Sequence, residues 1–170
     1  QPYRKNMIPD YEKIEALIRT TGAEGRIEEL TTEELKYYRL EGTEETIPTF
    51  REILELFAGK APLIVELKPL GKNHAALTEA TCKMLDEYNI DYCMESFDPR
   101  CVFWLKRHRP KIIRGQLSED FVRSDKKHLW ILRFWLKHLL LNFFTVPDFV
   151  AYKFADRKRS PSVWLCRKFW

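Results

Sequence analysis

A carboxylate and an ammonium group close a short apolar run near the middle of this sequence. Residues 62–68 read Pro-Leu-Ile-Val-Glu-Leu-Lys, which places Glu66 and Lys68 two residues apart at its end. If the run is a strand, both side chains project from one face, because strand side chains alternate with a period of two. A carboxylate can hold a divalent cation while a neighbouring lysine neutralises a phosphate oxygen. The pair therefore predicts either a metal and phosphate site or a structural ion pair.

Further polar and aromatic side chains stand at the ends of two more predicted strands. Glu95, Ser96 and Phe97 end the second strand, and Gln116 with Ser118 ends the third. In folds that alternate strands and helices, ligands bind at the carboxyl ends of the strands. The sequence therefore places these groups, like Glu66 and Lys68, at the ends of strands where a ligand would bind.

The elements that must position these residues alternate along the chain. Apolar runs predict four strands, at residues 62–68, 91–97, 111–117 and 148–153. Helical spacing predicts helices at residues 73–88, 99–107 and 127–144, and a last helix from about Ser160, with Pro161 in its first turn. Such alternation is typical of an α/β fold with parallel βα repeats. Four strands are too few for an eight-stranded barrel of about 250 residues, so the pattern fits an open sheet or part of a barrel.

Upstream of these repeats, the sequence predicts two short helices. Thr31-Thr32-Glu33-Glu34 reads as a helix cap followed by an acidic first turn, and it opens a helix through Leu35 to Leu40. Thr49 caps a second helix, from about Phe50 to Phe57, which Gly59 ends. Residues 1–18 receive no assignment.

Six segments, in this order and spacing, resemble the glycerophosphodiester phosphodiesterase family. The first two are Arg19-Thr20-Thr21-Gly22 with residues 25–31, and Ile47-Pro48-Thr49-Phe50-Arg51-Glu52. The others are Ile64-Val65-Glu66-Leu67-Lys68, Glu95-Ser96-Phe97-Asp98-Pro99, Ile113-Arg114-Gly115-Gln116-Leu117 and Asp148-Phe149-Val150-Ala151-Tyr152. The resemblance covers residues 19–170 and predicts two parts, an unassigned segment at 1–18 and a partial barrel at 19–170.

The resemblance implies a TIM (β/α)₈ barrel that hydrolyses glycerophosphodiesters to glycerol 3-phosphate and an alcohol. It implies a divalent cation, Mg²⁺ or Ca²⁺, and two histidines as general acid and base. By position, Glu66 would be a metal ligand and Lys68 a phosphate contact. Glu95, Ser96, Phe97 and Gln116 would line the pocket.

The sequence departs from the family at the catalytic histidines. No strand ending in a His-Arg pair is found, and Lys13 and Ile14 stand where the family has a later His-Asp pair. The closing strands, one of which ends in a Trp-Thr pair, would follow Trp170. We therefore expect a truncated chain with weak or no catalysis, since a general acid and a general base each contribute roughly 10²–10⁴-fold in rate. We expect structural roles for the four histidines, of which His74 is nearest to the active-site face.

Charge and aromatic residues gather in the second half of the chain. Residues 101–170 contain 16 Lys and Arg against 5 Asp and Glu, which favours anionic partners. Residues 129–144 combine aromatic side chains with Arg133 and Lys137 on one helical face. This segment predicts either a buried barrel-wall helix or a peripheral contact with anionic membranes. No nucleic-acid-binding motif accompanies the basic residues, so we expect no nucleic-acid partner.

The cysteines and the termini bear on the location of the protein. Cys82, Cys93, Cys101 and Cys166 form no zinc-type cluster, so we expect reduced thiols in a cytoplasmic protein, with or without peripheral membrane contact. The chain starts at Gln1 without a signal-peptide pattern, and we expect a processed product or a fragment.

Three functional hypotheses follow. The first is a truncated metal-dependent glycerophosphodiester phosphodiesterase, and the second is a non-catalytic module that binds lipid phosphates or anionic membranes. The third is a decayed gene product that folds poorly, because a partial barrel exposes strand edges. The sequence leaves open the alcohol, the preferred cation and the oligomeric state.

Overall fold

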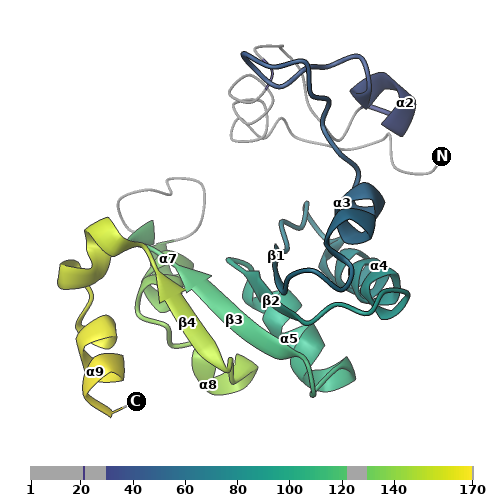
Figure 1. Ribbon diagram of the computed structural model, residues 1–170. Helices are drawn as coiled ribbons and strands as arrows, with labels where there is room; N and C mark the ends of the chain where they lie inside the picture. The colour runs from purple at the N-terminus through teal and green to yellow at the C-terminus, as the bar shows by residue number, and fades with distance from the viewer. Residues whose placement is uncertain (1–20, 22–29, 122–129, 170) are drawn as a thin grey trace. The chain divides into compact units, whose positions relative to one another are not determined.

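The structure is a computed structural model that describes Thr21 and residues 30–121 and 130–169 (Figure 1). The chain divides into two compact units, residues 1–53 and 54–170. The boundary predicted at residue 18 lies outside the described residues and stays a prediction.

The first unit contains a short helix, α2 (Thr32–Leu35), at the predicted start. The Thr31 hydroxyl accepts from the Glu34 backbone N–H, and the Glu34 carboxylate accepts from the Thr31 N–H at 2.7 Å, which is the predicted capping arrangement. The predicted continuation to Leu40 is wrong, because Arg39 forms an antiparallel bridge with Thr46 instead. A turn that contains Gly42, with φ +76°, brings these two residues together.

Helix α3 (Phe50–Phe57) has the predicted bounds. The Thr49 hydroxyl accepts from the Glu52 backbone N–H at 3.3 Å, and the Thr49 N–H donates to the Glu52 carboxylate at 2.7 Å. Gly59 follows the helix with φ +68°, a conformation that favours glycine after a helix end.

The second unit is built on a parallel sheet in which the strand order follows the sequence. The strands are β1 (Leu63–Glu66), β2 (Tyr92–Ser96), β3 (Ile113–Ser118) and β4 (Phe149–Tyr152). Helix α4 (His74–Asp86) connects β1 to β2, and helix α5 (Pro99–His108) connects β2 to β3. The four predicted strands and both intervening helices are therefore confirmed.

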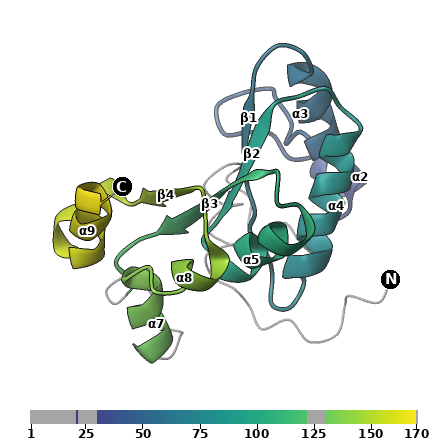
Figure 2. The same cartoon turned by 90° about the horizontal axis from the view of Figure 1, so that it is seen from below.

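Helices α4 and α5 lie on the same side of the strands (Figure 2). The apolar core forms on this side, where Met94 of β2 is fully buried and receives a contact from Cys82 Sγ of α4 at 3.7 Å. Other core side chains are Leu67, Leu85, Cys101, Val102 and Leu105. On the opposite side, Ile64 and Ile113 remain 71% and 55% exposed. We refer to that side, which carries residues 64, 66, 93, 95, 113, 115 and 149, as the open face.

The predicted single helix at residues 127–144 is wrong in the part that the structure describes. Helix α7 (Trp130–Lys137) ends before Leu139, which has φ 56°, and a separate short helix, α8 (Asn142–Thr145), follows. The last carbonyls of α7 bind other donors, because the Ser118 hydroxyl donates to Leu136 O at 2.9 Å and the Leu140 N–H donates to Trp135 O at 3.0 Å. These bonds end the helix despite its continuous apolar pattern. Residues 127–129 lie outside the described residues.

The chain after β4 forms a 3₁₀ helix, η2 (Phe154–Arg159), and then helix α9 (Pro161–Phe169). Helix α9 confirms the last predicted helix. Across the described ranges, no helix combines the length and apolar composition required to span a bilayer.

Candidate active site

Glu66 and Glu95 lie side by side on the open face of the sheet. Their Cα atoms are register partners in the parallel pairing of β1 with β2. Lys68 follows two residues after Glu66, and its Nζ lies 3.5 Å from Glu66 Oε2. The Lys68 side chain is 74% exposed and the Glu66 side chain 32% exposed. The carboxyl end of β1 thus presents a carboxylate and an accessible ammonium group.

The environment of Glu95 disfavours its ionised form. Burial raises the pKa of Glu95 above its ordinary value, and the negative charge of Glu66 raises this pKa further. A cation between the two strands would relieve both effects, because it favours the ionised carboxylate. The geometry therefore suits a positively charged ligand at this edge of the sheet.

Phe97 lies beyond Glu95 at the end of β2 and is 41% exposed. Its ring meets the Phe121 ring edge-to-face, with centroids 6.1 Å apart. The two aromatic rings supply an apolar surface next to the carboxylates, which is suited to the carbon skeleton of a small ligand.

Ser96 and Gln116 do not share the open face. Both side chains are buried on the helix side of the sheet, where the Ser96 hydroxyl donates to Leu67 O at 2.7 Å. The Gln116 amide donates to Ser96 O at 3.0 Å and to Phe97 O at 3.3 Å. These bonds hold the backbone at the end of β2 in place, so Ser96 and Gln116 have a structural role on the helix side of the sheet. The structure thus brings together Glu66, Lys68 and Glu95, and Phe97 follows directly after the end of β2.

Gly115 and Phe149 extend the open face beyond Glu95, and we did not predict them as site residues. Glu95 pairs with Gly115 and Gly115 pairs with Phe149 across three strands. The Phe149 ring lies over Gly115, in the space that a Cβ would occupy. A glycine inside a predicted strand is a sequence signal for such a close approach.

Arg114 and Asp148 have a structural role. Arg114 is 8% exposed, and its guanidinium donates to Val146 O at 2.9 Å. Its backbone N–H donates to the Asp148 carboxylate at 2.9 Å, and the two side chains approach to 3.4 Å. These contacts attach the start of β4 to β3, so the segments at 113–117 and 148–152 are held in register.

The described histidines do not join the carboxylates. His108 Nδ1 donates to Trp104 O at 3.0 Å, and His138 Nδ1 lies 3.3 Å from Ser162 Oγ. His74 faces α5, and its Nδ1 is buried without a hydrogen-bond partner in the described part of the chain. Within the same part, no three residues among His, Cys, Asp and Glu form a metal-binding group.

Comparison with known proteins yields matches among solved structures. No protein-family model matches the sequence, and no curated protein matches it significantly. A phosphodiesterase of Oleispira antarctica, solved in complex with its product sn-glycerol-3-phosphate, matches 87% of this chain with a TM-score of 0.64 and 20% identity. A protein of Galdieria sulphuraria that is designated a glycerophosphodiester phosphodiesterase matches 95% of this chain with a TM-score of 0.65 and 16% identity.

A third structure, a protein of Silicibacter pomeroyi DSS-3 with the glycerophosphoryl diester phosphodiesterase designation, matches 64% of this chain with a TM-score of 0.51 and 24% identity. The matches cover 60%, 61% and 46% of the Oleispira, Galdieria and Silicibacter proteins, respectively. The chain therefore spans part of the length of these proteins. It shares the fold of the glycerophosphodiester phosphodiesterases, and its four parallel strands with their helices correspond to part of a TIM barrel.

Proposed function

We propose that this chain is part of a glycerophosphodiester phosphodiesterase, with the barrel segment at residues 19–170, and that Glu66 and Lys68 bind a metal ion and a phosphodiester. The observation that carries the proposal is the placement of Glu66, Lys68 and Glu95 at the carboxyl ends of β1 and β2. The fold shared with a phosphodiesterase solved with glycerol 3-phosphate supports the same substrate class. Free Cys82, Cys93 and Cys101 support a cytoplasmic location.

The two carboxylates at the strand ends fit a divalent cation. Magnesium is often held by one or two protein carboxylates together with substrate phosphate oxygens and water. Glu66 and Glu95 supply two carboxylates at paired positions of adjacent strands. Burial raises the pKa of Glu95, and the negative charge of Glu66 raises it further. A bound Mg²⁺ or Ca²⁺ would act as a Lewis acid on the phosphodiester.

Lys68 would bind the phosphate beside such a cation. Its ammonium group is exposed and lies on the same face as both carboxylates. Phe97 and Phe121 would contact the carbon skeleton next to the phosphate. Binding would then depend on the residues of this chain, whereas turnover would also require an acid and a base, and no described histidine contacts Glu66 or Glu95.

The test measures binding and hydrolysis of glycerophosphocholine separately, with Mg²⁺ or Ca²⁺ present. Glu66→Ala should weaken binding at least tenfold, while Glu79→Ala, which removes an exposed carboxylate paired with Lys83 on α4, should leave it unchanged. Circular dichroism first establishes that each variant folds. Equal binding by the wild type and Glu66→Ala would contradict the proposed site.

A second candidate function is contact with anionic membranes through residues 129–144. Several apolar side chains of this segment are exposed, including Trp130 at 74% and Phe143 at 84%. Such exposed aromatic side chains can insert into the interface of a bilayer. Lys137 does not contribute a free charge, because its Nζ lies 2.9 Å from the buried carboxylate of Asp120.

Co-sedimentation with lipid vesicles tests whether this segment binds membranes. Vesicles with acidic headgroups should co-sediment the wild type at low salt, and the double variant Trp130→Ser with Phe143→Ser should reduce the bound fraction severalfold. Phe154→Ser, a change at another exposed aromatic residue, is the matched control. No binding to acidic vesicles by the folded wild type would exclude this function.

A further inference from the structure

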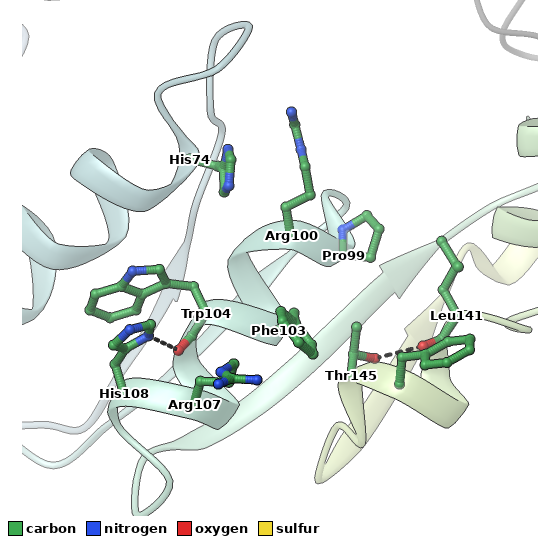
Figure 3. Close-up of a pocket in the computed structure, with 10 residues that line it drawn as sticks. His74, Pro99, Arg100, Phe103, Trp104, Arg107, His108, Leu141 and Thr145 are labelled. Atoms are coloured by element: carbon green, nitrogen blue, oxygen red, sulfur yellow. Dashed lines mark hydrogen bonds between the residues drawn. The ribbon is translucent and has the colours of Figure 1, made fainter.

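A second concave site lies along helix α5, on the helix-covered side of the sheet (Figure 3). Its volume is about 440 Å³, within the range of about 300–1,000 Å³ that is typical of small-molecule sites. The lining residues are His74, Pro99, Arg100, Phe103, Trp104, Arg107, His108, Leu141, Phe144 and Thr145. Glu66, Lys68 and Glu95 do not line it, so this α5 pocket is separate from the site at the strand ends.

The walls of the α5 pocket are largely apolar. Phe103 and Phe144 are 40% and 56% exposed, and Leu141 and Pro99 continue the apolar surface between them. Exposed apolar side chains that line a cavity gain free energy when a ligand covers them. The apolar body of a ligand would therefore lie against Phe103 and Phe144.

The charged groups at the α5 pocket all have one sign. Arg100 and Arg107 contribute to the lining, whereas no Asp or Glu does so. Arg100 is engaged by Asp98, with Nη2 at 2.7 Å from Oδ2, and by Gly71 O at 2.8 Å. Among the described residues, Arg107 makes no side-chain hydrogen bond or ion pair, and its Cζ lies 5.8 Å from the centroid of the Phe103 ring. Arg107 is therefore the cation that is available to an anionic ligand.

His74 supplies a further polar group. Its Nδ1 is buried and has no partner within the described ranges, and Figure 3 shows the ring beside α5 among the residues that line the α5 pocket. A buried polar atom without a partner is costly, and a ligand or a ligand-bound water would satisfy it. His74 therefore offers a polar contact in the lining in addition to Arg107.

We propose that the α5 pocket binds a small amphipathic anion, whose apolar body contacts Phe103, Leu141 and Phe144 and whose phosphate or carboxylate pairs with Arg107. The arrangement of one available guanidinium beside an apolar cavity is complementary to a ligand with a single anionic head and a hydrocarbon part. The site does not depend on the proposed phosphodiesterase function, because no residue is shared between the two sites.

Calorimetric titration of the full chain with decyl phosphate, decanoate and decanol, each below its aggregation concentration, tests the proposal. One or both anions should bind with a stoichiometry of one, and decanol should bind at least tenfold more weakly. Arg107→Ala should weaken binding of the anion about tenfold or more, as expected for loss of a charge-assisted pair. Phe103→Ser should also weaken it, whereas Lys111→Ala removes an exposed charge outside the lining and should not.

The comparison of the two anions identifies the head group, since preference for decyl phosphate indicates a phosphate ester and preference for decanoate a fatty acid. Glu66→Ala should bind the anion like the wild type, so loss of the strand-end site and loss of the α5 pocket can be told apart. Equal affinity of Arg107→Ala and the wild type would overturn the proposal. Binding only to vesicles or aggregates, and not to the single molecules, would overturn it as well.

Discussion

Asp120 and Lys137 form a buried ion pair between the end of β3 and helix α7. The Lys137 Nζ lies 2.9 Å from Asp120 Oδ1, and the Asp120 and Lys137 side chains are only 3% and 15% exposed. Together with the bond from the Ser118 hydroxyl to Leu136 O, the pair fixes the end of α7 on the sheet.

Removal of one partner should destabilise the second unit. Lys137→Met leaves the Asp120 carboxylate buried without its lysine, and we expect a loss of about 3–5 kcal/mol in the free energy of unfolding. Adding Asp120→Asn should restore part of this loss. Urea unfolding measures the stability of the single and the double variant. Lys83→Met is the control: it removes the exposed pair with Glu79 and should lower the free energy of unfolding by less than about 1 kcal/mol. A change below 1 kcal/mol for Lys137→Met would contradict a buried pair.

The contact between Gly115 and Phe149 predicts a site that is sensitive to a single methyl group. Gly115→Ala places a Cβ against the Phe149 ring, and we expect a loss of about 1–3 kcal/mol from overpacking. The double variant Gly115→Ala with Phe149→Ala should lose less unfolding free energy than the two single variants lose in sum, because truncation of Phe149 removes the overlap with the new Cβ. Strict additivity in urea unfolding would show that the two side chains do not meet.

The raised pKa of Glu95 predicts that the free energy of unfolding decreases as the pH rises above 4.5. The native state binds the Glu95 proton more tightly than the unfolded chain does, so this contribution to stability is fully present below the ordinary value of 4.5 and is lost as pH rises through the native pKa. Glu95→Gln should therefore gain stability relative to the wild type at pH 7, and the gain should vanish near pH 4.

Denaturant midpoints measured at intervals between pH 4 and pH 8 check this expectation. Glu79→Gln is the control, because a hydrogen bond from Lys83 lowers the pKa of Glu79. The contribution of Glu79 to stability is therefore constant above pH 4.5 and changes only at lower pH. An identical pH profile for Glu95→Gln and the wild type would contradict a raised pKa of Glu95 in the native state.

The buried thiols predict a pattern of alkylation. Burial raises the pKa of Cys82 to about 11, and burial also raises the pKa of Cys101. Since the thiolate is the reactive form, both residues should stay unmodified by iodoacetamide at pH 8 in the native protein and react after unfolding in urea. Peptide mass spectrometry measures the extent at each site. Rapid native labelling of Cys82 would contradict the core described around Met94.

The sequence predicted the sheet well because each strand of the second unit is a short apolar run between helical segments. Glu66 and Lys68 could be placed on one face from their spacing alone. Ser96 and Gln116 were expected in the same pocket because they are polar and stand at strand ends. Ser96 is adjacent to Glu95 and so points to the other face, and Gln116 is the register partner of Ser96. Both therefore lie on the helix side, where they bind backbone carbonyls.

The break between α7 and α8 could not be predicted from the local pattern. Residues 130–144 are apolar with helical spacing throughout, and no glycine or proline interrupts them. The helix ends because Ser118, a residue of β3, binds the Leu136 carbonyl and Leu139 adopts φ 56°. The α5 pocket was also not predicted, because it combines side chains from α4, α5 and the α8 region that lie far apart in the sequence.

The sequential strand order has a consequence for synthesis of the protein. Each strand pairs with the strand that precedes it in the chain, so β2 can join β1, and β3 can join β2, as soon as each has left the ribosome. Within the described sheet, β2, β3 and β4 each find a partner that has already been synthesised, which shortens the time for which that edge is available to other nascent chains. Ribosome-bound chains arrested after α5 should therefore already protect β1 and β2 from proteolysis.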